Sequence, residues 1–391
     1  MASPSTDRLH LIEYLQDPGN PDGESRERLI EACQDVIASL ERPIETARKQ
    51  AFLTLDHAVI RSAIKLNLFK ALDKEDRPYS TQELALATTP QCNHVLLSRL
   101  LRYLATRPLR LVIETSAGFW QRTARGSVFA QDSFKSGCSM YFDACGPAFQ
   151  ALPTWICTPD HERLHSPFQV AYPGQGSFFK RLQEDDSMLQ TFQCWMETVS
   201  RHQFCAQETI DFNEWIPDGT SDSDVVFVDV GGGTGDQAIA LGYKRIGLPG
   251  RIINQDLLPI SQEAEEMLRS HNIERITYNF FDEQPLKGAC VYHYRQIFHD
   301  WPDADCERIL RRAKDSMTAS STLLIDEVVL PETGAHWMVM QRDLTMMALF
   351  NAAERSQVQW SSLLQHVGLR IEAIRCYDDT MAACIIVAKS I

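Results

Sequence analysis

A glycine-rich turn between a predicted strand and a predicted helix is the first place in this sequence where chemistry could occur. The segment VVFVDVGGGTGDQAIALGYK, residues 225–244, starts as an apolar, β-branched run and continues with a helical pattern after Gly231, Gly233 and Gly235. Glycine has no Cβ, so the chain can turn sharply there and a ligand can approach the main chain at the start of the next helix. The segment therefore predicts a ligand-binding turn.

Acidic residues around this turn indicate which ligand it would hold. In the nicotinamide-binding pattern Gly-x-Gly-x-x-Gly, counted from Gly231, the third glycine would fall on Asp236, which argues against a dinucleotide. Asp229 lies two residues before the glycines, and Asp256 ends the next predicted strand, where an acid can accept from both ribose hydroxyls. A structural turn with two surface acids is the alternative. The pair of acids favours an adenosine with a sulfonium and an amino-acid tail, S-adenosylmethionine.

A histidine follows another predicted strand, residues 289–298, and is itself followed by Asp300 and Trp301. Ligands of open α/β sheets bind at the carboxyl ends of the strands, so His299 is expected on the donor's side of the sheet. Imidazole, with an ordinary pKa of about 6.5, can take the proton from a phenol or enol before that oxygen attacks a sulfonium methyl. A buried core histidine is the alternative, and we assign it to His293, inside the strand.

Composition narrows the possible partners. The 391 residues suffice for two or three domains, and 38 Lys and Arg against 52 Asp and Glu leave a formal charge of −14, which repels a phosphate backbone. No run reaches the roughly 18 apolar residues of a membrane-spanning helix, and the first residues are charged rather than apolar. The sequence thus predicts a cytoplasmic protein that binds neither nucleic acid nor a membrane.

The eleven cysteines are scattered singly, with no Cys-x-x-Cys pair and no histidine cluster at metal-ligand spacing. We therefore expect no metal site, and we interpret the cysteines as small buried apolar residues.

The N-terminal part has the pattern of a helical module with a hairpin. Residues 28–72 keep apolar residues at helical spacing, Ser80–Glu83 resembles a helix-capping sequence, an amphipathic helix follows Pro90, and a hairpin surrounds Gly118. This order predicts a winged helix, which could bind DNA. The leucine-rich face of its second helix and the overall acidity favour a packing role over DNA binding.

Residues 140–215 are predicted to be mostly helical, and after the polar segment 217–224 short apolar runs alternate with helical patterns. Such alternation predicts an α/β fold with a doubly wound, mostly parallel sheet covered on both faces. The last two runs, 369–377 and 382–390, are joined by too few residues for a parallel crossover, so they should form an antiparallel edge hairpin.

Several segments together resemble the plant and fungal O-methyltransferases related to caffeic acid O-methyltransferase: DVGGGTG, YRQIFHDWPDADCERIL, LLIDEVVLPE, DLTMMALFNAAERS and, near the N-terminus, LDHAVIRSAIKLNLFKAL. The resemblance covers nearly the whole chain. It implies a helical, winged-helix-like dimerisation domain at 1–130, a helical linker and acceptor-pocket region at 131–216, and a class I methyltransferase domain at 217–391. It also implies a homodimer whose second chain helps to wall the pocket of a small-molecule acceptor.

The resemblance also assigns site residues. It places His299 as the catalytic base, with Glu327 and Glu354 as the carboxylates that orient its ring, and it makes Arg295 a contact to the donor, for which a structural ion pair is the alternative. We expect Asp300 to anchor the turn rather than to act in catalysis.

Two residues near the donor site depart from the family pattern, and the residues that line the acceptor pocket cannot be assigned from the sequence. In NFF the amide Asn279 replaces the usual acid beside adenine, ahead of Phe280, and Gln296 replaces a basic residue. An amide oxygen can still accept from the adenine amino group. Residues that either line an acceptor pocket or belong to the core are Phe168, Phe178, Trp195, Trp301, Met338, Met340, Met346, Met347 and Phe350.

The sequence therefore predicts an S-adenosylmethionine-dependent O-methyltransferase that acts on a hydroxyl of a small aromatic or polyketide-like metabolite. An alternative is a protein of the same fold that binds the donor but catalyses a dehydration or pericyclic reaction, with the sulfonium as a fixed charge. A winged-helix DNA-binding regulator is the third reading.

Overall fold

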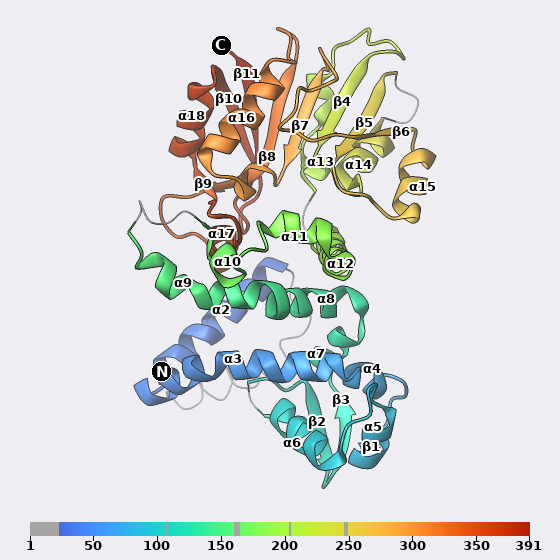
Figure 1. Ribbon diagram of the computed structural model, residues 1–391, viewed down its shortest axis with the longest axis vertical. Helices are drawn as coiled ribbons and strands as arrows, with labels where there is room; N and C mark the ends of the chain where they lie inside the picture. Colours follow the sequence, from blue (N-terminus) through green and yellow to red (C-terminus); the bar gives the residue numbers. More distant parts are fainter. Residues whose placement is uncertain (1–22, 107, 160–164, 203–204, 246–248) are drawn as a thin grey trace, which may run out of the picture. The chain divides into compact units, whose positions relative to one another are not determined.

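The computed structural model describes residues 23–106, 108–159, 165–202, 205–245 and 249–391 (Figure 1). The chain divides into two compact units, residues 1–60 and 61–391, and each is described by itself. The first contains α2 (Gly23–Leu40) and most of α3 (Pro43–Lys65). Large apolar side chains along both helices are exposed: Ile30, Val36, Ile37, Leu40, Ile44, Phe52, Leu53 and Leu55.

The second unit begins with the predicted helices and hairpin: α4 (Leu68–Leu72), β1 (Tyr79–Ser80), α5 (Thr81–Ala87), α6 (His94–Ala105), β2 (Val112–Ser116) and β3 (Phe119–Arg122). The strands form an antiparallel sheet in the order β1-β3-β2. Ser80 caps α5 as predicted, because the Glu83 N–H donates to its Oγ and its own N–H donates to the Glu83 carboxylate. One face of α6 is buried through Leu97, Leu101 and Leu104, which confirms the predicted packing face.

The helical region that follows contains α7 (Ala124–Ser127), η1 (Val128–Ala130), α8 (Asp132–Met140), η2 (Tyr141–Cys145), α9 (Gly146–Ile156), α10 (Pro167–Ala171), α11 (Phe178–Glu184), α12 (Asp186–His202), α13 (Ala206–Thr209) and η4 (Phe212–Trp215). Its aromatic core, around Phe168 and Phe178, also packs against Leu349 and Phe350. The predicted helical character of 140–215 is confirmed. Both predicted domain boundaries, 130/131 and 216/217, fall between elements and remain predictions.

The remaining elements build the predicted doubly wound sheet: β4 (Val225–Val230), α14 (Asp236–Lys244), β5 (Arg251–Asp256), α15 (Gln262–Ser270), β6 (Ile273–Thr277), β7 (Val291–Arg295), η5 (Phe298–Asp300), α16 (Asp303–Lys314), β8 (Thr322–Leu330), α17 (Trp337–Phe350), β9 (Arg355–Ser356), α18 (Gln357–His366), β10 (Leu369–Asp378) and β11 (Ala383–Ser390). The strand order is β10-β11-β8-β7-β4-β5-β6, with β9 beside β8. Strands β4 to β8 pair in parallel, while β11 pairs antiparallel with β8 and with β10. The edge hairpin is therefore confirmed.

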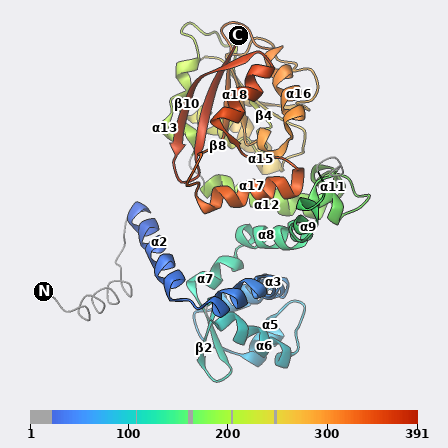
Figure 2. The same ribbon diagram turned by 90° about the vertical axis from the view of Figure 1, so that its left-hand side faces the viewer.

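Alternation along the strands sends neighbouring side chains to opposite faces. Val228, Tyr292 and Leu323 pack with α16 and α18 on one face. Phe227 and Leu324, one residue away, pack with α13, α14 and α15 on the other. Figure 2 shows α16 and α13 on opposite sides of the sheet.

Two predicted strands end earlier than the apolar runs suggested. Strand β6 ends at Thr277, before the end of the apolar run of residues 276–281, because Asn279 forms a turn in which its Oδ1 accepts from the Phe281 N–H at 3.1 Å. Strand β7 ends at Arg295 because Gln296 has a φ of +52°, outside the extended region. Glu327, predicted at the end of its strand, lies inside β8.

The interpretation of all cysteines as buried apolar residues was wrong. Cys376 and Cys384 face each other across β10 and β11 and form a disulfide. Of the other cysteines in the described residues, Cys145 and Cys306 are buried, Cys157 is exposed and the rest are intermediate. The register of β10 against β11 brings these two cysteines together, and the spacing of cysteines along the sequence does not reveal that register. No helix among the described residues combines the length and the apolar character needed to cross a bilayer.

Candidate active site

A cavity of about 1110 Å³ opens at the carboxyl ends of β4, β5 and β7. The glycine turn lines one part of it, and aromatic and methionine side chains of η2, α11, α12 and α17 line another. All eleven predicted site residues except Gly235, Glu327 and Glu354 line this cavity, and the two glutamates lie behind His299. The structure thus brings the donor turn and the candidate base to one chamber.

The glycine turn needs its glycines. Gly231, Gly233 and Gly235 have φ values of +73°, +54° and +89°, which side chains with a Cβ rarely adopt. A Cβ on Gly231 would lie 2.3 Å from Ile297 Cδ1, whereas nothing lies within 4 Å of a Cβ built on Gly233. Open space at Gly233 is what a ligand close to the main chain requires.

The two acids take different positions. The Asp256 carboxylate accepts from the Gly233 N–H at 2.9 Å and the Leu258 N–H at 2.8 Å, so each oxygen keeps a lone pair for another donor. Asp229 is buried, and its Oδ1 lies 2.9 Å from His293 Nδ1. Its Oδ2 has no hydrogen-bond partner among the described residues although it is buried. A buried carboxylate oxygen left this way fits a cationic or hydroxyl donor group of a ligand.

On the adenine side of the predicted donor site, Asn279 and Phe280 line the cavity. The Asn279 oxygen that was expected to accept from adenine already accepts from the Phe281 N–H, so its second lone pair would have to serve the ligand.

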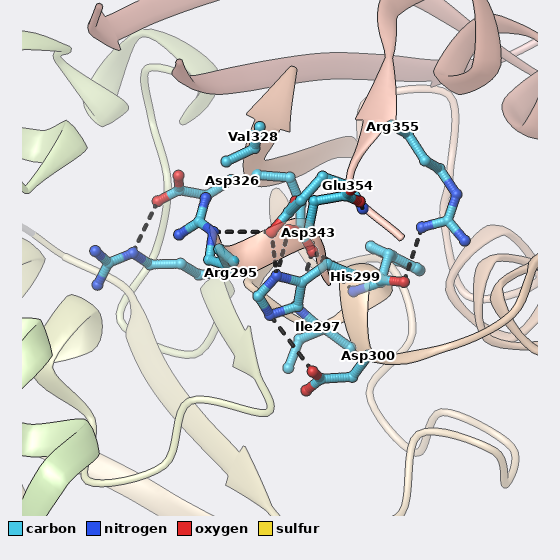
Figure 3. Close-up of polar contacts among 12 residues, drawn as sticks. Arg295, Ile297, His299, Asp300, Asp326, Val328, Asp343, Glu354 and Arg355 are labelled. Atoms are coloured by element: carbon cyan, nitrogen blue, oxygen red, sulfur yellow. Dashed lines mark hydrogen bonds and ion pairs between the residues drawn. The ribbon is translucent and has the colours of Figure 1, made fainter. Parts of the chain in front are cut away.

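His299 lies in η5, just after β7, and is 7% exposed. Its Nδ1 lies 2.8 Å from Glu354 Oε1, and its Nε2 lies 3.6 Å from Asp300 Oδ1. Figure 3 shows the ring between these two carboxylates. Because Glu354 accepts from Nδ1, the neutral ring carries its proton there and leaves Nε2 free to accept one.

The turn that carries His299 is held from two sides. Glu327 Oε1 accepts from the main-chain N–H groups of Ile297 and Phe298, both at 2.8 Å, and Glu327 Oε2 lies 3.9 Å from His299 Nδ1. Arg355, which the sequence reading missed, donates to the main-chain oxygens of Phe298 at 2.8 Å and Trp301 at 2.9 Å. Glu327 and Arg355 therefore position the turn, and Glu354 contacts the ring.

Charges around the ring decide its protonation. Burial lowers the pKa of His299, but the carboxylates of Glu354, Glu327 and Asp300 outweigh burial and raise the pKa to about 9. Burial, with the repulsion from Glu327 and Glu354, raises the pKa of Asp300 to about 7 in spite of the attraction to His299. The sequence suggested only that Asp300 anchors the turn. In the structure Asp300 also lies beside His299 Nε2 and lines the cavity.

His293 is a fully buried core residue, as predicted, but a charged one. It lies between Asp229 and Asp326, with Nε2 3.8 Å from Asp326 Oδ2. Burial lowers the pKa of His293, and the two carboxylates outweigh it and raise the pKa to about 9. Arg295 Nε lies 3.3 Å from the same Asp326 oxygen, so Arg295 makes the ion pair foreseen as the alternative and also lines the cavity.

The ambiguous apolar residues now separate. Phe178, Trp195, Trp301, Met338, Met346 and Phe350 line the cavity, whereas Phe168, Met340 and Met347 do not. Arg342, on α17, also lines it, and no sequence motif drew attention to it.

Comparisons with known proteins agree with this arrangement. Residues 158–370 match the family model of the O-methyltransferase domain, and residues 50–132 match that of the O-methyltransferase dimerisation domain. O-methyltransferase lepI of Aspergillus flavus is 30% identical over 373 residues, 94% of each chain. Demethylsterigmatocystin 6-O-methyltransferase of the same organism is 31% identical over 346 residues, 86% of each chain.

Solved structures of similar proteins cover almost the whole chain. The structure of LepI in complex with SAM is 28% identical, with a TM-score of 0.84 over 99% of this chain and 98% of that one. A structure described as a pericyclic reaction enzyme is 28% identical, with a TM-score of 0.85 over 98% of this chain and 100% of that one.

Proposed function

The chain belongs to the O-methyltransferase family, and from that premise we propose that it transfers the methyl group of S-adenosylmethionine to a hydroxyl of a small aromatic or polyketide-like metabolite. The observation that carries the proposal is the shared cavity, which both the glycine turn and His299 line. When bound, the donor supplies a methyl group on a positively charged sulfur.

Residues of the turn fit that donor. The unpartnered Asp229 Oδ2 suits its ammonium group or a hydroxyl, the lone pairs of Asp256 suit the ribose hydroxyls, and the open space at Gly233 admits a close ligand. The cavity is lined by the acids Asp229 and Asp256 and, among the described residues, by a single lysine, Lys180 of α11. Such a lining suits a cationic donor.

His299 acts as the general base. Its Nε2 takes the proton from the acceptor hydroxyl as the oxygen attacks, and the imidazolium that results stays paired with Glu354 through Nδ1. Since the pKa of His299 is about 9 before any ligand binds, the ring holds a proton at neutral pH and must release it first. A second positive charge in the same cavity lowers this pKa by repulsion, so donor binding prepares the base.

A homodimer completes the proposal. Among the described residues, eight large apolar side chains are exposed on α2 and α3, in and next to the part that matches the dimerisation domain, and exposed apolar surface of this kind is typical of a protein–protein interface. Light scattering behind size exclusion should give twice the 44.4 kDa of one chain. A monomer at micromolar concentration would contradict this part.

A pericyclic or dehydrating reaction is the second candidate, and one observation favours it. The imidazolium form of His299 and the guanidinium of Arg342 both lie at the cavity, and two positive donors can polarise a carbonyl without any methyl transfer. The similarity to a pericyclic reaction enzyme agrees with this reading.

Donor labelled with a trideuterated methyl group separates the two candidates. The purified protein is incubated with labelled donor and a panel of phenolic and enolic polyketides, and products are read by mass spectrometry. Methyl transfer adds the label to the product, and the His299→Ala variant should lose it by roughly a hundredfold or more. A product isomeric with its substrate, formed without label, would replace the proposal by the second candidate.

A further inference from the structure

We propose that Arg342 selects the acceptor, and that the protein prefers acidic acceptors, in which a carboxylate or enolate oxygen stands next to the hydroxyl presented to His299. The inference rests on the proposed function and adds to it the chemical class of the substrate. The guanidinium would bind the neighbouring oxygen while His299 receives the hydroxyl.

Arg342 lies beside the base. Its Nε is 2.8 Å from Glu354 Oε1, the same oxygen that lies 2.8 Å from His299 Nδ1. The two nitrogens are therefore no further apart than twice that distance. Both side chains line the cavity, and the Arg342 side chain is 16% exposed. The guanidinium therefore lies near the ring to which the acceptor hydroxyl would be presented.

Most of the hydrogen-bonding capacity of Arg342 is unused. A guanidinium has five N–H donors in a fixed plane that match a carboxylate or a pair of oxygens. In the described part of the chain, Nη1 and Nη2 of Arg342 have no hydrogen-bond partner, and Glu354 is the one ion-pair partner. Nη1 and Nη2 of Arg342 therefore remain available to a ligand.

Arg342 and His299 share one carboxylate oxygen, while Asp300 lies on the Nε2 side of the ring. Two cationic side chains, Arg342 and protonated His299, converge on one carboxylate oxygen of Glu354. Glu327 already accepts main-chain N–H groups through Oε1. A negative oxygen on the acceptor would form charge-assisted hydrogen bonds with the Arg342 guanidinium, and such bonds are about twice as strong as neutral ones.

The walls favour a flat acceptor. Phe179 is stacked between Trp301 and Phe350, with ring centroids 5.7 Å and 5.0 Å apart and interplanar angles of 15° and 14°. All three rings line the cavity. A planar aromatic acid has the shape for such walls and the charge for Arg342.

Binding of two matched probes tests the assignment without any need for methyl transfer. Calorimetry measures 1-hydroxy-2-naphthoic acid and 1-naphthol, which differ only by the carboxylate, in the presence of S-adenosylhomocysteine. The wild-type protein should bind the acid at least about tenfold more tightly. Arg342→Met should abolish that preference while the naphthol affinity changes less than about twofold, and Arg342→Lys should restore part of it. Arg311→Met, which removes an exposed arginine of α16 outside the cavity, should leave both affinities unchanged.

Three results would overturn the inference: no preference for the acid in the wild-type protein, no measurable binding of the acid, or an equal loss of both probes in Arg342→Met with thermal stability and S-adenosylhomocysteine affinity intact. An equal loss would mean that Arg342 only orients Glu354. Calorimetry measures binding and does not depend on methyl transfer. The two probes can therefore be compared even if no labelled product forms, so a failure of this inference can be told from a failure of the proposed function.

Discussion

Donor binding should release a proton from His299, and the raised pKa of that ring allows the amount to be worked out. With a pKa of about 9, the ring is roughly 90% protonated at pH 8. A unit charge within about 8 Å, at an effective dielectric constant of about 20, changes the free energy of protonation by about 2 kcal/mol and so lowers the pKa by about 1.5. The protonated fraction then falls to roughly a quarter, and roughly 0.6 proton leaves on binding.

Two ligands that differ in this one charge provide the assay. S-adenosylmethionine carries the sulfonium and S-adenosylhomocysteine a neutral thioether. Calorimetric titrations of each ligand at pH 8, in buffers with different ionisation enthalpies, give the number of protons released. The difference between the ligands should be roughly 0.6 in the wild-type protein and should disappear in the His299→Asn variant.

Equal proton release with both ligands would refute the reasoning, because it would mean that the donor charge does not reach His299. A difference that persists in His299→Asn would place the responding group elsewhere, and His293, with its pKa also raised to about 9 beside Asp229, would be the first candidate. Asp300, with a pKa of about 7, is mostly ionised at pH 8 and contributes little.

Further predictions concern single residues. Glu354→Gln removes the carboxylate that most strongly raises the pKa of His299, which should fall from about 9 to roughly 7.5, so the proton release at pH 8 shrinks to about a third; an unchanged release would contradict this. Gly233→Ala should weaken donor affinity at least tenfold in calorimetry, whereas Gly174→Ala, with a similar positive φ and equally open surroundings outside the cavity, should leave it unchanged. His293→Phe removes the partner of the buried Asp229 carboxylate and one of the partners of Asp326, and should lower the free energy of unfolding by roughly 3 to 5 kcal/mol in urea titrations. The stabilisation from His293 is full below its unfolded pKa of about 6.5 and is lost as pH rises through about 9, so the wild-type advantage should shrink over that window. Retention of DNA fragments at about 150 mM salt should be undetectable, since the chain carries a net charge of −14.

The fold followed from patterns that neighbouring residues share. The apolar runs of β4, β5, β7 and β8 had the composition of strands buried on both faces, and the short link between the last two strands allowed only a hairpin. The glycine turn was equally readable, because three of its four glycines, Gly231, Gly233 and Gly235, have a positive φ. In these cases the residues that determine the local structure lie within or next to the element that they form.

Contacts between distant elements were not readable. Arg342 meets Glu354 because α17 passes the start of β9, and Asp343 of the same helix accepts the Glu354 N–H at 2.9 Å. Tyr377 donates to Asp326 at 2.6 Å from β10, next to the His293 pair. Neither periodicity nor spacing states which side chains will face each other across a sheet, so Arg342, Arg355 and the disulfide partners gave no signal in the sequence.

The protonation of His299 decides between the two candidate reactions. As an imidazolium, beside Arg342, the ring is an electrophilic donor suited to a carbonyl; as a neutral ring held by Glu354 through Nδ1, it is a base suited to a hydroxyl. The carboxylates of Glu354, Glu327 and Asp300 favour the imidazolium, and a positively charged donor opposes them. A positively charged donor therefore favours the neutral ring that can act as a base, whereas a neutral thioether in the donor's place would leave two cationic side chains, His299 and Arg342, at the cavity.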